Sequence, residues 1–317
     1  MKVRARMGLR EDWTDRRRLL RFLAGELERG RLTLVLGSGV SFPFGLPEWV
    51  ELVVRLFEQV GLDVPATDPA QAAEVFRIEH CESDESRFLA AVDEALYRDA
   101  DLSPDRLSAR STLSALGAIM MALSRRASVA QAVTFNFDDV LEQYLDLNGL
   151  SVRSVGEAAH WAGDSEALVF HPHGLLPQLP FSERSSRLIF DQRSYSKEIG
   201  NDSQPWRQQL VTLMRTNTCL FVGVGSRDGA MDSLLVKVSE LHAANGFGQL
   251  FWGVRTVVGA PESERLIWND RNVFLADVGD FDQGLPQFLF SICRIAAEAR
   301  RARFAREGRR RSRRTSL

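Results

Sequence analysis

The chain has 317 residues, of which 44% are hydrophobic and 26% charged, so it can bury a core without disulfides or a structural metal. Its three cysteines lie far apart and none forms a Cys-x-x-Cys pair, which excludes a zinc ribbon and fits a reducing cytosol. The sequence contains no apolar run of about 18 residues and no signal-peptide pattern. We therefore expect a cytoplasmic protein without a membrane partner.

The first predicted elements are a helix, a strand and a second helix. Apolar residues recur at helical spacing over residues 13–28. The run Leu32–Leu36 is apolar on both faces, as in a buried parallel strand. A further helical stripe follows Pro47 and stops at Gly61. Residues 62 to about 130 show only helical periodicity, which predicts a helical insertion beside a sheet.

The strand pattern then resumes and alternates with helices. Further strands are predicted at 130–135, 167–171, 219–223, 250–254 and 273–276. Helices are predicted from Asp138 to Leu147 and after Met231. This alternation predicts an α/β fold: a Rossmann-like, doubly wound, mostly parallel sheet with a helical insertion.

The end of the chain differs in charge from the rest. Ten arginines and two glutamates lie between Arg294 and Leu317, a local charge of +8, so the remainder carries −10 against the overall −2. A basic tail of this kind is either a disordered, solvated segment or a binding segment for nucleic acid or an acidic partner. We divide the chain into a helical arm over 1–30, a main domain over 31–300 and a basic, disordered tail over 301–317.

Small and polar residues follow four of the predicted strands. These loops are Gly37-Ser38-Gly39-Val40-Ser41, Asn136-Phe137-Asp138-Asp139, Pro172-His173-Gly174 and Gly223-Val224-Gly225-Ser226-Arg227-Asp228. Open parallel sheets bind ligands beyond the carboxyl ends of their strands. The clustering therefore predicts a nucleotide-sized site at this edge.

Each loop also has a simpler interpretation. Gly37 and Gly39 are equally consistent with a tight turn, because Phe42 stands where the dinucleotide fingerprint has a third glycine. Asn136 is a residue type that caps helices. His171 and His173 share one face of a strand and are a possible metal pair, but the sequence shows no third ligand nearby. We therefore predict no metal site.

The order of the motifs is more specific than any one of them. They are Gly37-Ser-Gly-Val-Ser41, Gly45-Leu-Pro-Glu-Trp49, Thr134-Phe-Asn-Phe-Asp138, His173-Gly174 and Phe221-Val-Gly-Val-Gly-Ser226. This succession resembles the sirtuin superfamily, and most closely the bacterial SIR2-like branch found in antiphage defence. The resemblance extends from Leu32 to Asp228 and more loosely to Asp277.

The resemblance implies a role for each matching residue. NAD would be held by Gly37, Ser38, Gly39 and Ser41 at the diphosphate, by Asp138 near the nicotinamide amide, and by Gly223, Ser226 and Asp228 in the loop for the adenosine half. Asn136 would contact the nicotinamide ribose and position water, and His173 would be the catalytic histidine. We assign His173 as the general base.

The departures from the family indicate which reaction to expect. Deacetylating sirtuins carry a four-cysteine zinc module, which three scattered cysteines cannot build, so no zinc is expected. Val50 replaces their arginine after Pro47, and Arg255 lies where an Ile-Asn pair is usual. The sequence thus predicts an NAD glycohydrolase that uses NAD as substrate. The alternatives are an NAD- or ADP-ribose-binding module without turnover, and a protein deacylase or ADP-ribosyltransferase.

The resemblance also implies regulation and assembly. It predicts a triggered, NAD-depleting antiphage effector, because an activity that consumes NAD must be restrained. We expect a homo-oligomer or a partner protein such as a HerA-like ring ATPase. Direct nucleic-acid binding through the basic tail stays open.

Overall fold

The centre of the protein is one parallel sheet. The computed structural model describes residues 13–314 apart from 122–128, 157–165, 181, 199–200, 202, 226–228 and 247–250. The strands are β1 (Leu32–Leu36), β2 (Gln131–Thr134), β3 (Val152–Val155), β4 (Ala167–Phe170), β5 (Thr218–Val222), β6 (Gly253–Val257) and β7 (Val273–Asp277). Their order is β3-β4-β2-β1-β5-β6-β7, and each described pair is parallel. Without the edge strand β3, this is the Rossmann strand order.

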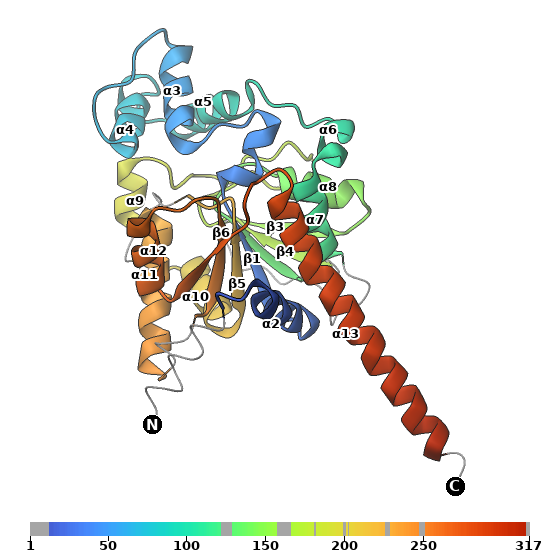
Figure 1. Cartoon of the computed structure of the whole chain (residues 1–317). Helices are drawn as coiled ribbons and strands as arrows, with labels where there is room; N and C mark the ends of the chain where they lie inside the picture. The colour runs from blue at the N-terminus through green and yellow to red at the C-terminus, as the bar shows by residue number, and fades with distance from the viewer. Residues whose placement is uncertain are drawn as a thin grey trace.

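Helices cover both faces of the sheet (Figure 1). They are α2 (Arg16–Glu28), α3 (Trp49–Gln59), α4 (Pro69–Glu79), α5 (Glu85–Tyr97), α6 (Pro104–Ala109), α7 (Ser111–Met120), α8 (Val140–Leu147), α9 (Gln192–Glu198), α10 (Pro205–Thr216), α11 (Gly229–Ala244), α12 (Glu262–Asp270) and α13 (Gly284–Arg314). On β1, Leu34 and Leu36 enter the core shared with α2, α7, α8 and α13. Val35 enters the core shared with α10, α11 and α12, because successive side chains of a strand face opposite ways.

The predicted fold class is confirmed, and several elements differ in detail from their predictions. The strand predicted at 250–254 runs instead from Gly253 to Val257. The prediction ended too early because the strand contains the polar residue Arg255. Within the helical insertion predicted from 62 to about 130, Arg110 has an extended backbone and separates α6 from α7. β3 was not predicted, because this edge strand has the half-polar sequence Val-Arg-Ser-Val.

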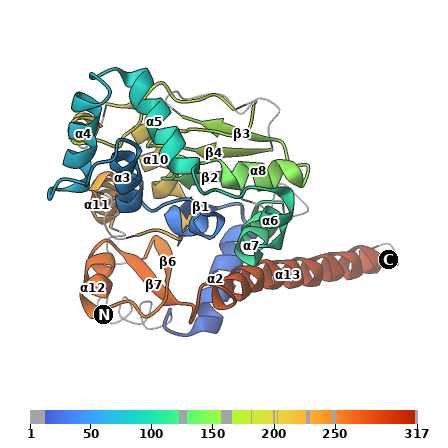
Figure 2. The ribbon, with the colours of Figure 1, turned by 90° about the horizontal axis from the view of Figure 1, so that it is seen from above.

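The arginine-rich end also differs from its prediction. We expected a disordered tail from residue 301, whereas the backbone of α13 is helical through Arg314. Alanine, arginine and glutamate are strong helix formers, and they dominate this segment. α13 projects well beyond the body of the protein in both views (Figures 1 and 2). Among the described residues, no helix is long and apolar enough to cross a membrane.

Candidate functional site at the carboxyl edge of the sheet

The loops after β1 and β5 contact each other through their backbones. The amide of Gly37 donates to the carbonyl of Val222 at 3.1 Å, and that of Gly39 to the carbonyl of Gly223 at 3.0 Å. A Cβ atom on Gly39 would lie 2.8 Å from the Cα atom of Gly223. Strand order reverses between β1 and β5, which is where doubly wound folds bind nucleotides. The glycines therefore permit this close contact between the loops.

The β1 loop uses most of its own amides. Those of Val40 and Ser41 donate to the carbonyls of Gly37 and Ser38, in addition to the donations from Gly37 and Gly39. Ser38 is half-exposed and Gly39 exposed at the loop surface. Ser38 and Gly39, two of the residues predicted to bind NAD, are thus the part of this loop that reaches the surface.

Three of the predicted site residues form one chain of hydrogen bonds. The side-chain nitrogen Nδ2 of Asn136 donates to the carbonyl of Gly37 at 3.1 Å and to Oγ of Ser41 at 3.0 Å. Ser41 Oγ donates in turn to Oδ1 of Asp138 at 2.8 Å. The loop after β2 is thus fixed to the loop after β1. This arrangement leaves Oδ1 of Asn136 as the atom of its amide that accepts hydrogen bonds.

Asp138 is buried beneath this chain of hydrogen bonds. Burial raises its pKa to about 6, the nearby Asp139 and Glu142 act in the same direction, and hydrogen bonds from Ser41 and the Val140 amide oppose the rise. The carboxyl group therefore changes charge just below neutral pH. It is able to accept or donate a hydrogen bond there, depending on its protonation.

His173 lies among aromatic rings on the same edge. Its ring centroid is 5.0 Å from that of Phe135 and 6.4 Å from that of Phe137, the two residues that flank Asn136. Tyr195 of α9 packs on it at 5.9 Å, and the side chain is almost fully buried. The carbonyl of His173 accepts the amide of Ile189 at 2.9 Å. The structure thus brings both predicted catalytic residues to one region.

Two acidic residues that the sequence analysis gave no catalytic role also contribute to the site. Asp139 accepts the amides of Gln178 and Leu179 at 3.0 and 2.8 Å, which ties the segment after His173 to the start of α8. Glu142, in the first turn of α8, contacts His171. No clear sequence signal pointed to Glu142, because α8 also carries the polar residues Gln143 and Asp146.

The residues assigned to the adenosine half are only partly described. Gly223 directly follows β5 and lies against Gly39, while Ser226 and Asp228 fall outside the described residues. Arg255 donates from Nε to the carbonyl of Val224 at 2.9 Å and lies over the ring of Trp268. Arg255 therefore anchors the loop after β5 through the carbonyl of Val224.

A groove of about 650 Å³ adjoins the Asp139 end of the site. Its lining comprises Ser86, Leu89, Ala90, Asp93, Glu94, Tyr97, Arg98, Gln178 and Arg184. Tyr97 donates from its hydroxyl to the carbonyl of Leu176 at 2.7 Å, so it stands between the groove and the buried carboxylates. Among the described residues, no group of three or more His, Cys, Asp or Glu side chains is arranged to hold a metal ion.

Comparison with known proteins agrees with this geometry. Residues 130–276 match the family model described as a SIR2-like domain. The matched span includes Asn136, Asp138, His173 and Gly223 and covers β2 to β7 almost completely. No curated protein matches the chain. SIR2-like domains use NAD, and the chain is similar to this family over 147 of its 317 residues.

Proposed function

We propose that the protein is an NAD glycohydrolase that converts NAD and water to nicotinamide and ADP-ribose. The observation that carries the proposal is the chain of hydrogen bonds from Asn136 through Ser41 to Asp138, beside the strand-order reversal. In a SIR2-like domain, this is the expected place for the nicotinamide half of NAD.

The proposed reaction breaks the bond between nicotinamide and C1′ of the ribose. Nicotinamide leaves as a neutral molecule with the bonding electrons, and the ribose acquires oxocarbenium character. A water oxygen then bonds to C1′ and its proton passes to His173. Asn136 orients that water through Oδ1, because its Nδ2 is already engaged by Gly37 and Ser41. Asp138 contacts the carboxamide of nicotinamide.

Water is the proposed acceptor because the chain cannot build a sirtuin zinc module. Only three cysteines are present, and Cys81 and Cys219 are buried in separate cores. The closely packed surroundings of His173 also favour chemistry in a site with little bulk water, where polar contacts act more strongly.

The test supplies the full chain with NAD and measures the release of nicotinamide by chromatography. Asn136→Ala and His173→Ala should each lower kcat by about 10²–10⁴-fold, as expected for loss of water positioning or of a general base. Asn245→Ala is the matched control, because Asn245 is exposed and its side chain donates to the carbonyl of Leu241 at the end of α11. Full activity in both site variants would refute the assignment.

A binding module without turnover is the second candidate function. It is favoured by the burial of His173 between Phe135 and Tyr195, which restricts access to its ring. Calorimetry that detects NAD binding, with no nicotinamide released under any partner condition, would support this candidate over hydrolysis.

We propose further that hydrolysis is triggered, as in an antiphage effector, and takes place in the cytoplasm. The support is the resemblance of the ordered motifs to the defence branch of the superfamily. A homo-oligomer or a HerA-like ring ATPase would supply the restraint. Nicotinamide release measured with and without the products of neighbouring genes tests this directly, and a monomer that is fully active alone would contradict it.

A further inference from the structure

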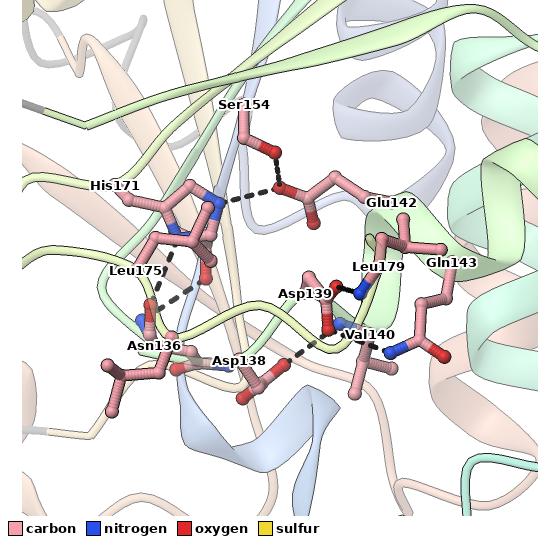
Figure 3. A network of polar contacts seen from close by, with 12 residues as sticks. Asn136, Asp138, Asp139, Val140, Glu142, Gln143, Ser154, His171, Leu175 and Leu179 are labelled. Atoms are coloured by element: carbon pink, nitrogen blue, oxygen red, sulfur yellow. Dashed lines mark hydrogen bonds and ion pairs between the residues drawn. The ribbon is translucent and has the colours of Figure 1, made fainter. Parts of the chain in front are cut away.

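His171 and Glu142 form a buried pair directly behind Asn136 (Figure 3). Nε2 of His171 lies 2.6 Å from Oε1 of Glu142, and the side chains are 0% and 3% exposed. Nδ1 of the same ring lies 3.2 Å from the backbone carbonyl oxygen of Asn136. Ser154 of β3 donates from Oγ to Oε1 of Glu142 at 3.0 Å. The pair therefore joins β3, β4 and α8 to the loop after β2.

Both partners of the imidazole are hydrogen-bond acceptors. A carbonyl oxygen and a carboxylate each need an N–H group, so a ring that bonds both is protonated on both nitrogens. Burial alone would lower the pKa of His171, but Glu142, the Asn136 carbonyl and Asp138 together raise it. A small cavity beside His171 is lined, among the described residues, by uncharged groups that include Trp206, Gln209 and Leu210 of α10. The two charged groups that raise the pKa of His171, Glu142 and Asp138, are both acidic.

The contact between His171 and the Asn136 carbonyl adds to the hydrogen bonds that fix Asn136. Its amide donates to Oγ of Thr134 at 3.2 Å, and its side chain is held by Gly37 and Ser41. The contact with His171 fixes the backbone carbonyl of Asn136 as well. Without a proton on Nδ1, two lone pairs would face each other and the peptide after Asn136 would turn.

We infer that the His171–Glu142 ion pair is a positioning device that holds the backbone of Asn136 in the orientation needed for hydrolysis. The inference rests on the proposed function and adds two residues to it. His171 does not touch the reacting atoms, so its effect passes through Asn136. The same contacts explain why a His-x-His pair stands here, since His171 is engaged by a carboxylate and a carbonyl.

Two substitutions of His171 separate its two bonds. The amide of His171→Asn overlies Nδ1 and can still donate to the Asn136 carbonyl, whereas that of His171→Gln overlies Nε2 and reaches only Glu142. We expect kcat for nicotinamide release to fall about 100-fold in H171Q and by no more than about tenfold in H171N. In both variants, KM for NAD should stay within about threefold of the wild-type value. Equal loss of kcat in the two variants would overturn the inference.

The pH profile tests the charge of the pair. Wild-type kcat should fall as the pH rises through the pKa of His171. The side chain of Glu142→Gln has the same shape without the charge. In this variant, the fall in kcat should begin at least about one pH unit lower than in the wild type. An alkaline limb that E142Q leaves in place contradicts the role of Glu142.

A measurement without NAD distinguishes this inference from the proposed function. In nuclear magnetic resonance of the full chain, the side-chain amide of Asn136, assigned with N136A, should titrate together with His171, one of five histidines. Both titrations should move to lower pH in E142Q. A protein that shows this coupling but no hydrolysis retains the positioning pair and loses the proposed function, whereas an Asn136 amide that ignores the titration of His171 overturns the pair itself.

Discussion

Asp138 is a residue whose burial opposes folding at neutral pH. Its pKa is about 6 in the folded protein, against 3.8 for an ordinary aspartate. The folded state therefore binds this proton more tightly than the unfolded state does. Its contribution to stability is fully present below pH 4 and is lost as the pH rises through 6. A carboxyl group kept here despite that effect is consistent with a role in NAD binding.

Asp138→Asn should therefore stabilise the protein at pH 7.5 by about 1–3 kcal/mol, and by much less at pH 5. The amide retains Oδ1, which accepts hydrogen bonds from Ser41 and the Val140 amide. Urea unfolding at the two pH values measures the difference. Asp146→Asn, at an exposed site on α8, which begins two residues after Asp138, is the control and should change stability by less than about 0.5 kcal/mol at either pH. A D138N effect independent of pH would contradict the role of burial.

The residues found from the sequence are those placed by local order. Asn136 and Asp138 directly follow β2, and Ser41 closely follows β1, so predicting the strands was enough to predict their neighbourhood. The pairing of Glu142 with His171 was not predictable in this way. It requires β4 to lie beside β2 and the first turn of α8 to face the end of β4, and both are properties of the tertiary structure.

At the scale of elements, the loops after β1 and β5 act as one unit. Gly223 has a φ angle of +66°, and a Cβ atom there would lie 2.7 Å from the amide nitrogen of Val40. Gly225, two residues later in the same loop, has no atom of the described residues within 4 Å of the corresponding position. The same substitution at these two glycines thus tests the contact between the loops.

We predict that Gly223→Ala lowers the free energy of unfolding by about 2–4 kcal/mol, through the left-handed backbone and the clash with the β1 loop. Gly225→Ala should change it by less than about 0.5 kcal/mol. Chemical denaturation measures both, and NAD binding by calorimetry should weaken only in G223A. Similar free energies of unfolding in G223A and G225A would show that the contact between the loops after β1 and β5 does not stabilise the fold.

The helices α9, α10 and α12 were not predicted, and the strand β3 was missed because it lacks a regular apolar period. β3 carries an exposed Arg153 and a Ser154 whose hydroxyl is committed to Glu142, so its alternation is weak. The N-terminal boundaries of β1, β4 and β7 were predicted well, because these strands begin abruptly with apolar residues. The formation of an edge strand such as β3 therefore depends on tertiary contacts more than on its own sequence pattern.

At the scale of the whole molecule, the site combines two separate parts of the chain. The SIR2-like match begins at residue 130, yet Gly37 and Ser41, which hold the side chain of Asn136, precede it by about ninety residues. The helices between them, α3 to α7, leave the carboxyl edge of β1 and return to the start of β2. This connection brings Tyr97 and Trp49 to the site, and it agrees with the predicted helical insertion.

α13 divides into a part that packs and a part that projects. Its buried side chains are Leu285, Phe288, Leu289, Ile292 and Ala296, and they join the core shared with α2 and α7. From Ala297 to Arg303, the described side chains are exposed or half-exposed. The projecting part therefore adds charge to the molecule without adding to the described core.

Truncation after Arg303 should leave the free energy of unfolding within about 0.5 kcal/mol of the full chain and leave nicotinamide release unchanged. The removed segment carries six arginines and one glutamate, so the net charge changes from −2 to −7 and anion-exchange retention should increase. Ile292→Ala is the contrasting variant, because it opens a cavity in the packed part and should cost about 2–5 kcal/mol. Loss of more than 2 kcal/mol in the truncated chain would show that the projecting part supports the fold. Loss of activity at unchanged stability would instead assign it a role at the site.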